Sequence, residues 1–377
     1  MLKIGYDAKR LYNNFTGLGN YSRTLLKDLS DHFPENEYFL FSSKVIKNDR
    51  TKPFLNQTKF IIKKAQGNNT YWRSFGIKKD LLESQIQLFH GLSHEIPLGL
   101  QQTKIKSVVT IHDLILKHYP HQFSWVDRNI YDWKFRYSCE NADRIIAISE
   151  STKKDIIHFY NIPPEKIEVI YQTCDALFKN QNTSESSPDI QQKYKLPEDY
   201  LLYVGSIIER KKLLPIVQAI HLLPKDYQLP IVILGDGKIY KNKVMEYVTK
   251  NNLESLVLFP KNVSFLDFPA IYRDAKMLIY PSIYEGFGIP LIEALFSKIP
   301  VITTNLSSLP EAAGAGAHYI EAPDPELIKA GIEKILSDPD YANAITEKGF
   351  RFVQRFHSKA LADQMMELYK KVLKSDA

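Results

Sequence analysis

The sequence contains very little cysteine. Two of its 377 residues are cysteines, Cys139 and Cys174, and they form no Cys-x-x-Cys pattern. This usage excludes a disulfide framework and is typical of a reducing compartment. No spacing of histidine, cysteine and carboxylate residues resembles a zinc site. We therefore expect neither structural disulfides nor a zinc centre.

Long hydrophobic runs are also missing. No uninterrupted apolar run approaches the roughly 18 residues of a membrane-spanning helix. The N-terminus, MLKIGYDAKR, lacks the apolar core and the cleavage site of a signal peptide. Hydrophobic residues make up 44% and charged residues 24%, which is typical of a globular protein in water. We expect a cytoplasmic protein, and peripheral binding to the inner face of the cytoplasmic membrane stays open.

Several catalytic motifs are absent. The sequence has neither a P-loop nor Gly-x-Ser-x-Gly, and no Asp-x-Asp pattern placed to hold a metal against a diphosphate. Gly17-Leu18-Gly19 resembles part of a dinucleotide fingerprint, with Ser22 in place of the third glycine. The second predicted strand, however, ends in Phe41-Ser42-Ser43 and not in an acidic residue, which disfavours a nicotinamide cofactor. We expect no metal and no cofactor.

The net charge of +6 is concentrated in one region. Between positions 44 and 80, Asp49 and Asp80 are the only acidic residues and face ten basic ones: Lys44, Lys47, Arg50, Lys52, Lys59, Lys63, Lys64, Arg73, Lys78 and Lys79. This region is either a solvated face or a surface for anionic lipid or an anionic acceptor, and Trp72 and Phe75 among the charges favour the second. No nucleic-acid-binding signature accompanies it.

Short β-rich runs alternate with helical patterns along the whole chain, and many of these runs are continuously apolar. Such runs indicate strands buried on both faces of a parallel sheet, so we predict α/β architecture with doubly wound sheets. The predicted strands cover residues 2–7, 38–43, 59–63, 87–91, 107–112, 144–149, 166–171, 200–205, 230–235, 257–259, 276–281, 300–304 and 318–320.

The polar segment KNQNTSESSPDIQQ divides the alternation into two halves. It indicates a linker at residues 179–196 between Rossmann-like domains at 1–178 and 197–357. Apolar residues at helical spacing predict a last helix within residues 358–377. Because ligands bind beyond the carboxyl ends of parallel strands, we expect two such domains to enclose a cleft.

The segment YPSIYEGFGIPLIEALFSKIP, residues 280–300, is the most informative. It places Glu285 and Glu293 eight positions apart around Gly286-Phe287-Gly288. A predicted strand precedes this turn, and Pro290 favours the start of a helix after it. Backbone N–H groups at such a turn suit a phosphate, and the flanking carboxylates suit hydroxyls. The pattern predicts a nucleotide-sugar site.

Three further segments carry site candidates. Arg210, Lys211 and Lys212 stand where a strand gives way to a helix, and cations there can clamp a diphosphate. Gly235 and Gly237 permit a tight turn near a ligand, although such turns are common. Candidate histidines near strand ends are either structural or part of the site: His90, His94 and His112.

These segments together resemble retaining glycosyltransferases of family 4, which have the two-domain GT-B fold. EGFGIPLIE matches the family's Glu-x7-Glu motif, and VGSIIERKKL matches its strand-loop-Arg-Lys segment. LPEAAG, TGLGNYSRTLL, VVTIHDL and NADRIIAISESTKKDI are similar to family segments and occur in the family's order. The resemblance covers nearly the whole chain.

The resemblance implies metal-independent transfer of a hexose from a nucleotide-diphosphate sugar, such as GDP-mannose or a UDP-hexose, to a hydroxyl acceptor with retention of configuration. It implies a glycan or lipid-linked glycan acceptor in polysaccharide, lipopolysaccharide or glycolipid assembly. The last helix would cross back to the first domain, the acceptor-binding one. The implied catalytic residues are Arg210, Lys211, Glu285 and His112; the implied donor-binding residues are Gly17, Gly19, Gly205, Gly286, Phe287, Gly288, Ile289 and Glu293.

The chain departs from the family pattern in two places. Tyr171-Gln172-Thr173-Cys174-Asp175 stands where relatives often have Asn-Gly or Gln-Gly before Val-Asp, and Lys212 stands where many carry asparagine or glycine. Two other functions stay open: a GT-B nucleotide-sugar epimerase, and a catalytically silent partner that binds sugar nucleotides.

Overall fold

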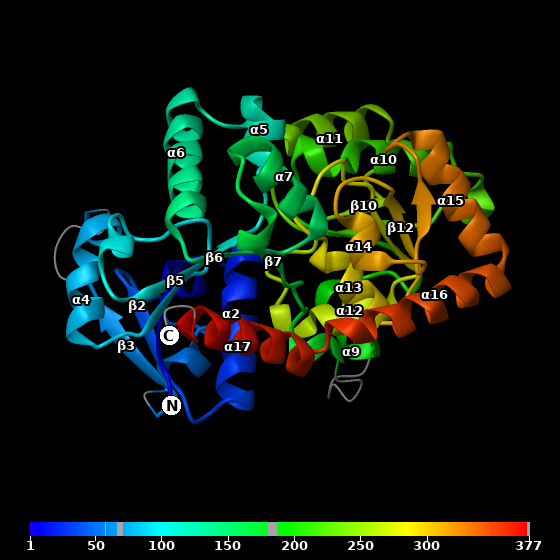
Figure 1. The fold of residues 1–377 in the computed structure, drawn as a ribbon. Coiled ribbons are helices and arrows are strands. Elements are labelled where there is room, and N and C mark those ends of the chain that lie inside the picture. Colours follow the sequence, from blue (N-terminus) through cyan, green and yellow to red (C-terminus); the bar gives the residue numbers. More distant parts are fainter. Residues whose placement is uncertain (57, 66–70, 180–186, 375–377) are drawn as a thin grey trace. The chain divides into compact units, whose positions relative to one another are not determined.

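The protein folds into two compact units. The structure, a computed structural model, describes residues 1–56, 58–65, 71–179 and 187–374. One unit comprises Met1–Thr173 together with Phe356–Ala377, and the other comprises Cys174–Arg355. Each unit is a parallel sheet with helices packed on it (Figure 1). The predicted α/β class with two doubly wound sheets is therefore confirmed.

The first unit is built on a parallel sheet with the order β3-β2-β1-β4-β5-β6-β7 in the described residues. Its strands are β1 Lys3–Asp7, β2 Glu37–Ser42, β3 Phe60–Lys64, β4 Leu88–Gly91, β5 Lys106–Ile111, β6 Arg144–Ala147 and β7 Ile167–Val169. Its helices are α1 Lys9–Asn13, α2 Gly17–His32, α4 Ile77–Glu83, α5 Ile115–His118, α6 Trp125–Asn141, α7 Glu150–Tyr160 and α17 Ser358–Lys374. The strand order reverses direction between β1 and β4, so loops diverge there at the carboxyl edge.

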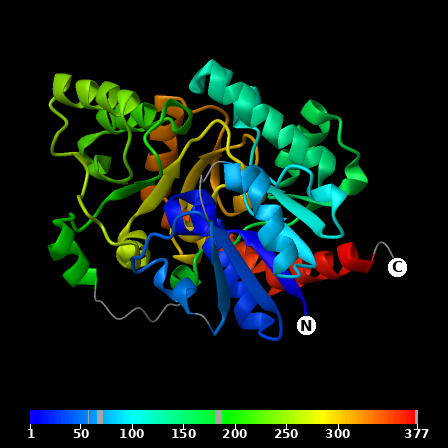
Figure 2. The same ribbon diagram turned by 90° about the vertical axis from the view of Figure 1, so that its left-hand side faces the viewer.

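The last helix, α17, belongs to this first unit. It packs against α2 and β5 and is drawn in red in Figure 1 and Figure 2. Leu361, Met365 and Tyr369 lie on its buried face, at the spacing that predicted it. Deep in the core, the Tyr369 hydroxyl hydrogen-bonds with His90 Nδ1 at 2.6 Å. The predicted return of this helix to the first domain is confirmed.

The second unit has the sheet order β10-β9-β8-β11-β12-β13 in the described residues. Its strands are β8 Leu201–Val204, β9 Ile231–Leu234, β10 Val257–Leu258, β11 Met277–Tyr280, β12 Val301–Thr304 and β13 His318–Ile320. Its helices are α8 Ala176–Lys179, α9 Ser187–Tyr194, α10 Leu213–Leu222, α11 Ile239–Lys250, α12 Phe268–Asp274, α13 Ile289–Phe296, α14 Leu309–Ala313, α15 Pro325–Ser337 and α16 Pro339–Val353. Here the strand order reverses between β8 and β11.

Every predicted strand forms in the described residues, and no end differs by more than two positions. The central strands β8, β9, β11 and β12 are buried at every residue, as their continuous apolar runs indicated. The predicted linker at 179–196 is described in part. Its residues 180–186 lie outside the described residues, and Ser187–Tyr194 forms α9, which packs on α12.

Candidate functional site

The candidate site lies in the second unit, where the strand order reverses. After β8, the chain turns through Glu209–Lys211 before α10 begins, and after β11 it turns through residues 281–288 before α13 begins. Loops that leave β8 and β11 diverge because the two connections run to opposite sides of the sheet. Such a point is where open α/β sheets bind ligands.

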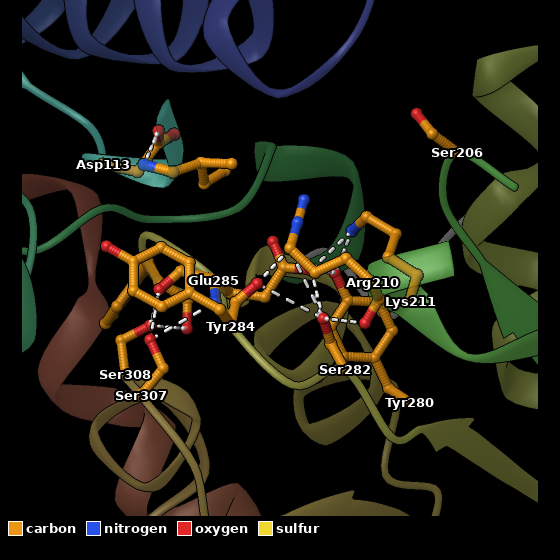
Figure 3. Close-up of polar contacts among 12 residues, drawn as sticks. Asp113, Ser206, Arg210, Lys211, Tyr280, Ser282, Tyr284, Glu285, Ser307 and Ser308 are labelled. Carbon is orange, nitrogen blue, oxygen red and sulfur yellow. Dashed lines mark hydrogen bonds and ion pairs between the residues drawn. The ribbon is translucent and has the colours of Figure 1, made fainter. Parts of the chain in front are cut away.

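Glu285 is the centre of this site. Its Oε1 lies 2.9 Å from Arg210 Nη1 and 2.9 Å from Lys211 Nζ, and it accepts hydrogen bonds from Ser282 Oγ at 2.8 Å and Tyr280 Oη at 3.0 Å. Figure 3 shows these contacts. The structure thus brings three of the predicted catalytic residues into one cluster, although they come from two loops.

The cluster holds its charges at neutral pH. Burial by itself would raise the pKa of Glu285, but the nearby Lys211 and Arg210 outweigh it and lower this pKa to about 2. Burial also lowers the pKa of Lys211, an effect that Glu285 opposes. The site therefore contains a carboxylate that is ionised at neutral pH and is in contact with two cations.

Arg210 is fixed by the loop that it faces. Its side chain is 6% exposed, and Nη1 donates to the carbonyl oxygen of Tyr284 and to Ser282 Oγ at 3.4 Å. The backbone of Ile283 donates to the Arg210 carbonyl at 3.1 Å. These bonds tie the β8 loop to the β11 loop, so the guanidinium is positioned before any ligand arrives.

Sequence reasoning missed four polar residues of the site. Tyr280 Oη bonds to Glu285 and accepts from Lys211 Nζ, which lies 4.7 Å from the centre of the Tyr280 ring. Ser307 Oγ and Ser308 Oγ donate to the Glu285 carbonyl at 2.7 and 2.8 Å. Ser282, whose Oγ donates to Glu285, is the fourth missed residue. The position of Tyr280 at the end of β11 was the one available signal.

Ser308 supports the turn between the two glutamates. Its Oγ also donates to the carbonyl of Phe287, whose side chain is buried. Gly288, the last residue before α13, has φ +120°. A Cβ on Gly288 would lie 3.1 Å from Leu309 Cδ2. The positive φ favours glycine here, and a Cβ would also force the Leu309 side chain to shift. Gly286 is the first residue of this turn, and Ile289 follows it as the first residue of α13.

Glu293 lies apart from the Glu285 cluster in its bonding. It is on α13, is 5% exposed, and accepts a 2.6 Å hydrogen bond from the Tyr272 hydroxyl. A buried carboxylate on an apolar helix needs such a partner. The implied role of Glu293 in donor binding stays a prediction.

The glycines after β8 and β9 serve the packing of the two loops. Gly205 has φ +142°, and a Cβ on it would lie 3.4 Å from Lys211 Nζ. A Cβ on Gly235 would lie 1.9 Å from the Gly205 carbonyl oxygen, and one on Gly237 would lie 2.2 Å from that of Ile207. Gly235 and Gly237 are therefore needed for close contact between backbones. This packing explains both glycines even if neither contacts a ligand.

In the first unit, His112 follows β5 and is 3% exposed. Its Nε2 donates to the Leu92 carbonyl at 2.8 Å, and its Nδ1 lies 3.3 Å from Gln172 Nε2. Because a carbonyl only accepts, Nε2 carries the proton. Burial lowers the pKa of His112 to about 4, so it is neutral at neutral pH.

The other two histidines are in the core. His90 bonds to Tyr369 and, through Nε2, to Thr110 Oγ1 at 2.8 Å, and His94 stacks on Phe135 with ring centres 4.2 Å apart. Burial lowers the pKa of His90 to about 3 and that of His94 well below its usual value. These contacts support a structural role for His90 and His94 and not a role in the site.

These buried histidines predict a loss of stability in mild acid. Below pH about 6.5 the unfolded chain binds protons that folded His90 and His112 exclude, so the free energy of unfolding falls by up to about 1.4 kcal/mol per pH unit for each histidine. The loss continues toward their folded pKa values of about 3 and about 4. Glu285, whose folded pKa is depressed, loses its contribution only below pH about 4.5.

Urea unfolding at pH 7 and pH 5 measures this effect. His90→Gln should reduce the difference between the two pH values, whereas the same change at the exposed His121 should not. Equal stability of the wild-type protein at both pH values would contradict the expected charge state of the buried histidines.

Gly17 and Gly19 lie at the start of α2. A Cβ on Gly17 would meet nothing within 4 Å, whereas one on Gly19 would lie 1.8 Å from the Asn14 carbonyl oxygen. Gly19 is therefore explained by packing against its own loop. Gly17 has open space beside it, and its implied role in donor binding stays a prediction.

The basic region from Lys44 to Lys79 needs a correction. Trp72 is 6% exposed and its Nε1 donates to Asp80 at 2.6 Å, so the prediction that it supports a membrane surface is wrong. Arg73 is bound to Asp7 at 2.6 Å and to Glu95 at 2.8 Å. Phe75 is 45% exposed and stacks on Tyr71. The burial of Trp72 and the ion pairs of Arg73 thus remove these two residues from the predicted membrane surface.

In the described part of the chain, no helix is both long and apolar enough to cross a membrane. No group of three or more histidine, cysteine, aspartate or glutamate residues there is arranged to hold a metal ion.

Comparison with known proteins gives matches along most of the chain. Residues 17–176 match the family described as Glycosyltransferase Family 4, and residues 186–352 match Glycosyl transferases group 1. The O-antigen chain mannosyltransferase B of Escherichia coli is 25% identical over 98% of this chain and 100% of its own length. The O-antigen chain mannosyltransferase RfbU of Salmonella typhimurium is 31% identical over 66% of this chain and 64% of its own length.

A solved structure with a similar fold is HepE of Anabaena in complex with UDP and glucose. Its TM-score is 0.76 at 16% identity, and the match covers 98% of this chain and 100% of that one. At this identity the likeness concerns the fold alone.

Proposed function

Since the chain belongs to the glycosyltransferases of group 1 and family 4 and has their GT-B fold, we propose that it moves a hexose from a nucleotide-diphosphate sugar to a hydroxyl of a glycan acceptor, with retention of anomeric configuration. The observation that carries this proposal is the pair Arg210 and Lys211, held beside an ionised Glu285 where the strand order reverses.

The two cations supply most of the catalysis in this proposal. Arg210 and Lys211 bind the diphosphate and stabilise the negative charge that builds on it as it leaves. Two fixed cations can do what a metal ion does at other diphosphate sites, so no metal is required. Glu285 Oε2, which has no hydrogen bond to the described residues, accepts from a hydroxyl of the donor sugar.

The remaining predicted residues complete the donor site. The N–H groups of Gly286 to Ile289 lie toward the phosphate side, Glu293 binds the ribose, and Gly17 and Gly19 lie near the phosphates. His112 reaches the donor sugar, and its longer contact, from Gln172 at 3.3 Å, is the one that a sugar hydroxyl would replace. Because His112 is neutral, it acts by hydrogen bonding and not as an acid.

The chemical step follows from the leaving group. The bond between the sugar's anomeric carbon and the diphosphate oxygen breaks, and the acceptor oxygen bonds to that carbon on the same face. The acceptor's proton passes to the departing diphosphate, so an obligatory protein base is not needed. Positioning and electrostatic stabilisation then provide the rate.

The names of the relatives suggest the setting. Two of them are O-antigen chain mannosyltransferases, which favours a mannosyl or other hexosyl donor, such as GDP-mannose or a UDP-hexose, and a polysaccharide or lipid-linked glycan acceptor. We place the enzyme in the cytoplasm at the inner face of the cytoplasmic membrane. The exposed lysines between Lys44 and Lys79 would contact that surface.

A thermal-shift screen with GDP, UDP, ADP and their sugars tests donor binding. A ligand that binds only the folded state at 100 times its Kd stabilises the protein by about 2.7 kcal/mol, so at least one of these nucleotides should raise the melting temperature. AMP, GMP and UMP are the matched controls, because they lack the diphosphate. No stabilisation by any diphosphate would contradict the proposal, and turnover of a nucleotide-sugar to its epimer without an acceptor would favour the epimerase.

A further inference from the structure

We infer that the Glu285 carboxylate is the internal counter-ion of Arg210 and Lys211, and that it gives up both cations when a nucleoside diphosphate binds. The inference rests on the proposed function, because it takes these two cations as the groups that bind phosphate. Donor binding at this site then costs the free energy of separating Glu285 from the two cations. Removal of the negative charge of Glu285 should abolish this cost.

The first argument is the convergence on a single oxygen. Arg210 Nη1, Lys211 Nζ, Ser282 Oγ and Tyr280 Oη all lie within 3.0 Å of Glu285 Oε1. A carboxylate oxygen has two lone pairs, so four donors exceed what it can satisfy well. This oxygen therefore satisfies the hydrogen-bonding capacity of the two cations only in part, which leaves them able to bind a second anion.

The second argument is burial. The side chains of Arg210, Lys211 and Glu285 are 6%, 12% and 12% exposed. A charge with so little contact with water needs a counter-charge nearby. Before the donor binds, Glu285 meets that need for both cations, and a diphosphate meets it afterwards. The bound diphosphate and Glu285 then compete for the same two cations and repel each other.

The third argument concerns what holds Glu285 after the exchange. Ser282 and Tyr280 are neutral donors that a phosphate does not compete for electrostatically, and both are bound to Oε1. They keep the carboxylate oriented when the diphosphate takes over as the counter-charge of the two cations. Oε2 then remains directed to the sugar, so one residue serves as counter-ion before binding and as a sugar contact afterwards.

Calorimetric titration with GDP and UDP at low ionic strength tests the inference. Glu285→Gln keeps the shape of the side chain and removes its charge, and we expect it to bind the nucleoside diphosphate about tenfold more tightly than the wild-type protein. Glu285→Ala removes the same charge by a second route and should also bind more tightly. Without ligand, both variants should melt at a lower temperature and gain more from the nucleotide than the wild type does.

The matched control is Glu209→Gln. Glu209 is the exposed residue directly before Arg210, so its change alters the local net charge equally without removing a bond to either cation. Binding by Glu285→Gln that equals or falls below the wild-type affinity would overturn the inference and leave the proposed function intact. Equal tightening in Glu209→Gln would overturn it too, since net charge alone would then explain the effect. Failure of every variant to bind either nucleotide would contradict the proposed function as well.

Discussion

Replacing Arg210 or Lys211 by alanine is expected to lower kcat for sugar transfer by about a hundredfold to a thousandfold, the size of losing one donor to a developing oxyanion. Each side chain would contact the leaving diphosphate, and each is held in place by Glu285 before the donor binds. Steady-state kinetics with saturating donor measures the effect, and circular dichroism checks that the variants fold.

The matched control for these variants is Lys212→Gly. Lys212 is the next basic residue, and its φ of +53° is a left-handed conformation that suits glycine or asparagine better than lysine. Lys212→Gly should therefore keep its activity while it loses the same charge. Near-normal turnover of both Arg210→Ala and Lys211→Ala would contradict the assigned roles.

Gly19→Ala is expected to destabilise the protein by about 3 kcal/mol or more, because the added methyl group would overlap the backbone of Asn14. The Cβ would lie 1.8 Å from the Asn14 carbonyl oxygen, and the backbone cannot move aside without shifting the start of α2. Urea unfolding of the variant and the wild type, at one pH, gives the difference in free energy.

Gly17→Ala is the control at the same helix end. Its Cβ would meet no atom within 4 Å, so the stability should stay within about 0.5 kcal/mol of the wild-type value. A similar loss in both variants would mean that glycine is needed at the start of α2 for backbone conformation and not for close approach.

Much of the fold could be predicted because its signals are local. Buried parallel strands have continuous apolar runs, as in β8, β9 and β11. That Glu285, Arg210 and Lys211 belong to one site was implied by the family resemblance, whereas their ion pairs were not predicted. The family is confirmed by the comparisons.

The features that were not predicted depend on contacts between segments far apart in the chain. A single sequence does not reveal such contacts. Tyr280 looked like one more apolar strand residue, and only the fold shows that its hydroxyl reaches Lys211 and Glu285. Trp72 was assigned to the surface from its charged neighbours, but a turn of the backbone buries it against Asp80. In both residues an aromatic ring carries one polar atom, whose partner decides which way the ring faces.

The measurement that tests the central claim most directly is the transfer product itself. The enzyme is incubated with GDP-mannose or a UDP-hexose and a mannose-terminated oligosaccharide, and proton NMR records the configuration of the new linkage as it forms. We predict one nucleoside diphosphate released per linkage, with the anomeric configuration of the donor, and loss of both signals in Lys211→Ala. A linkage of inverted configuration, or no linkage from any donor that the protein binds, would contradict the account.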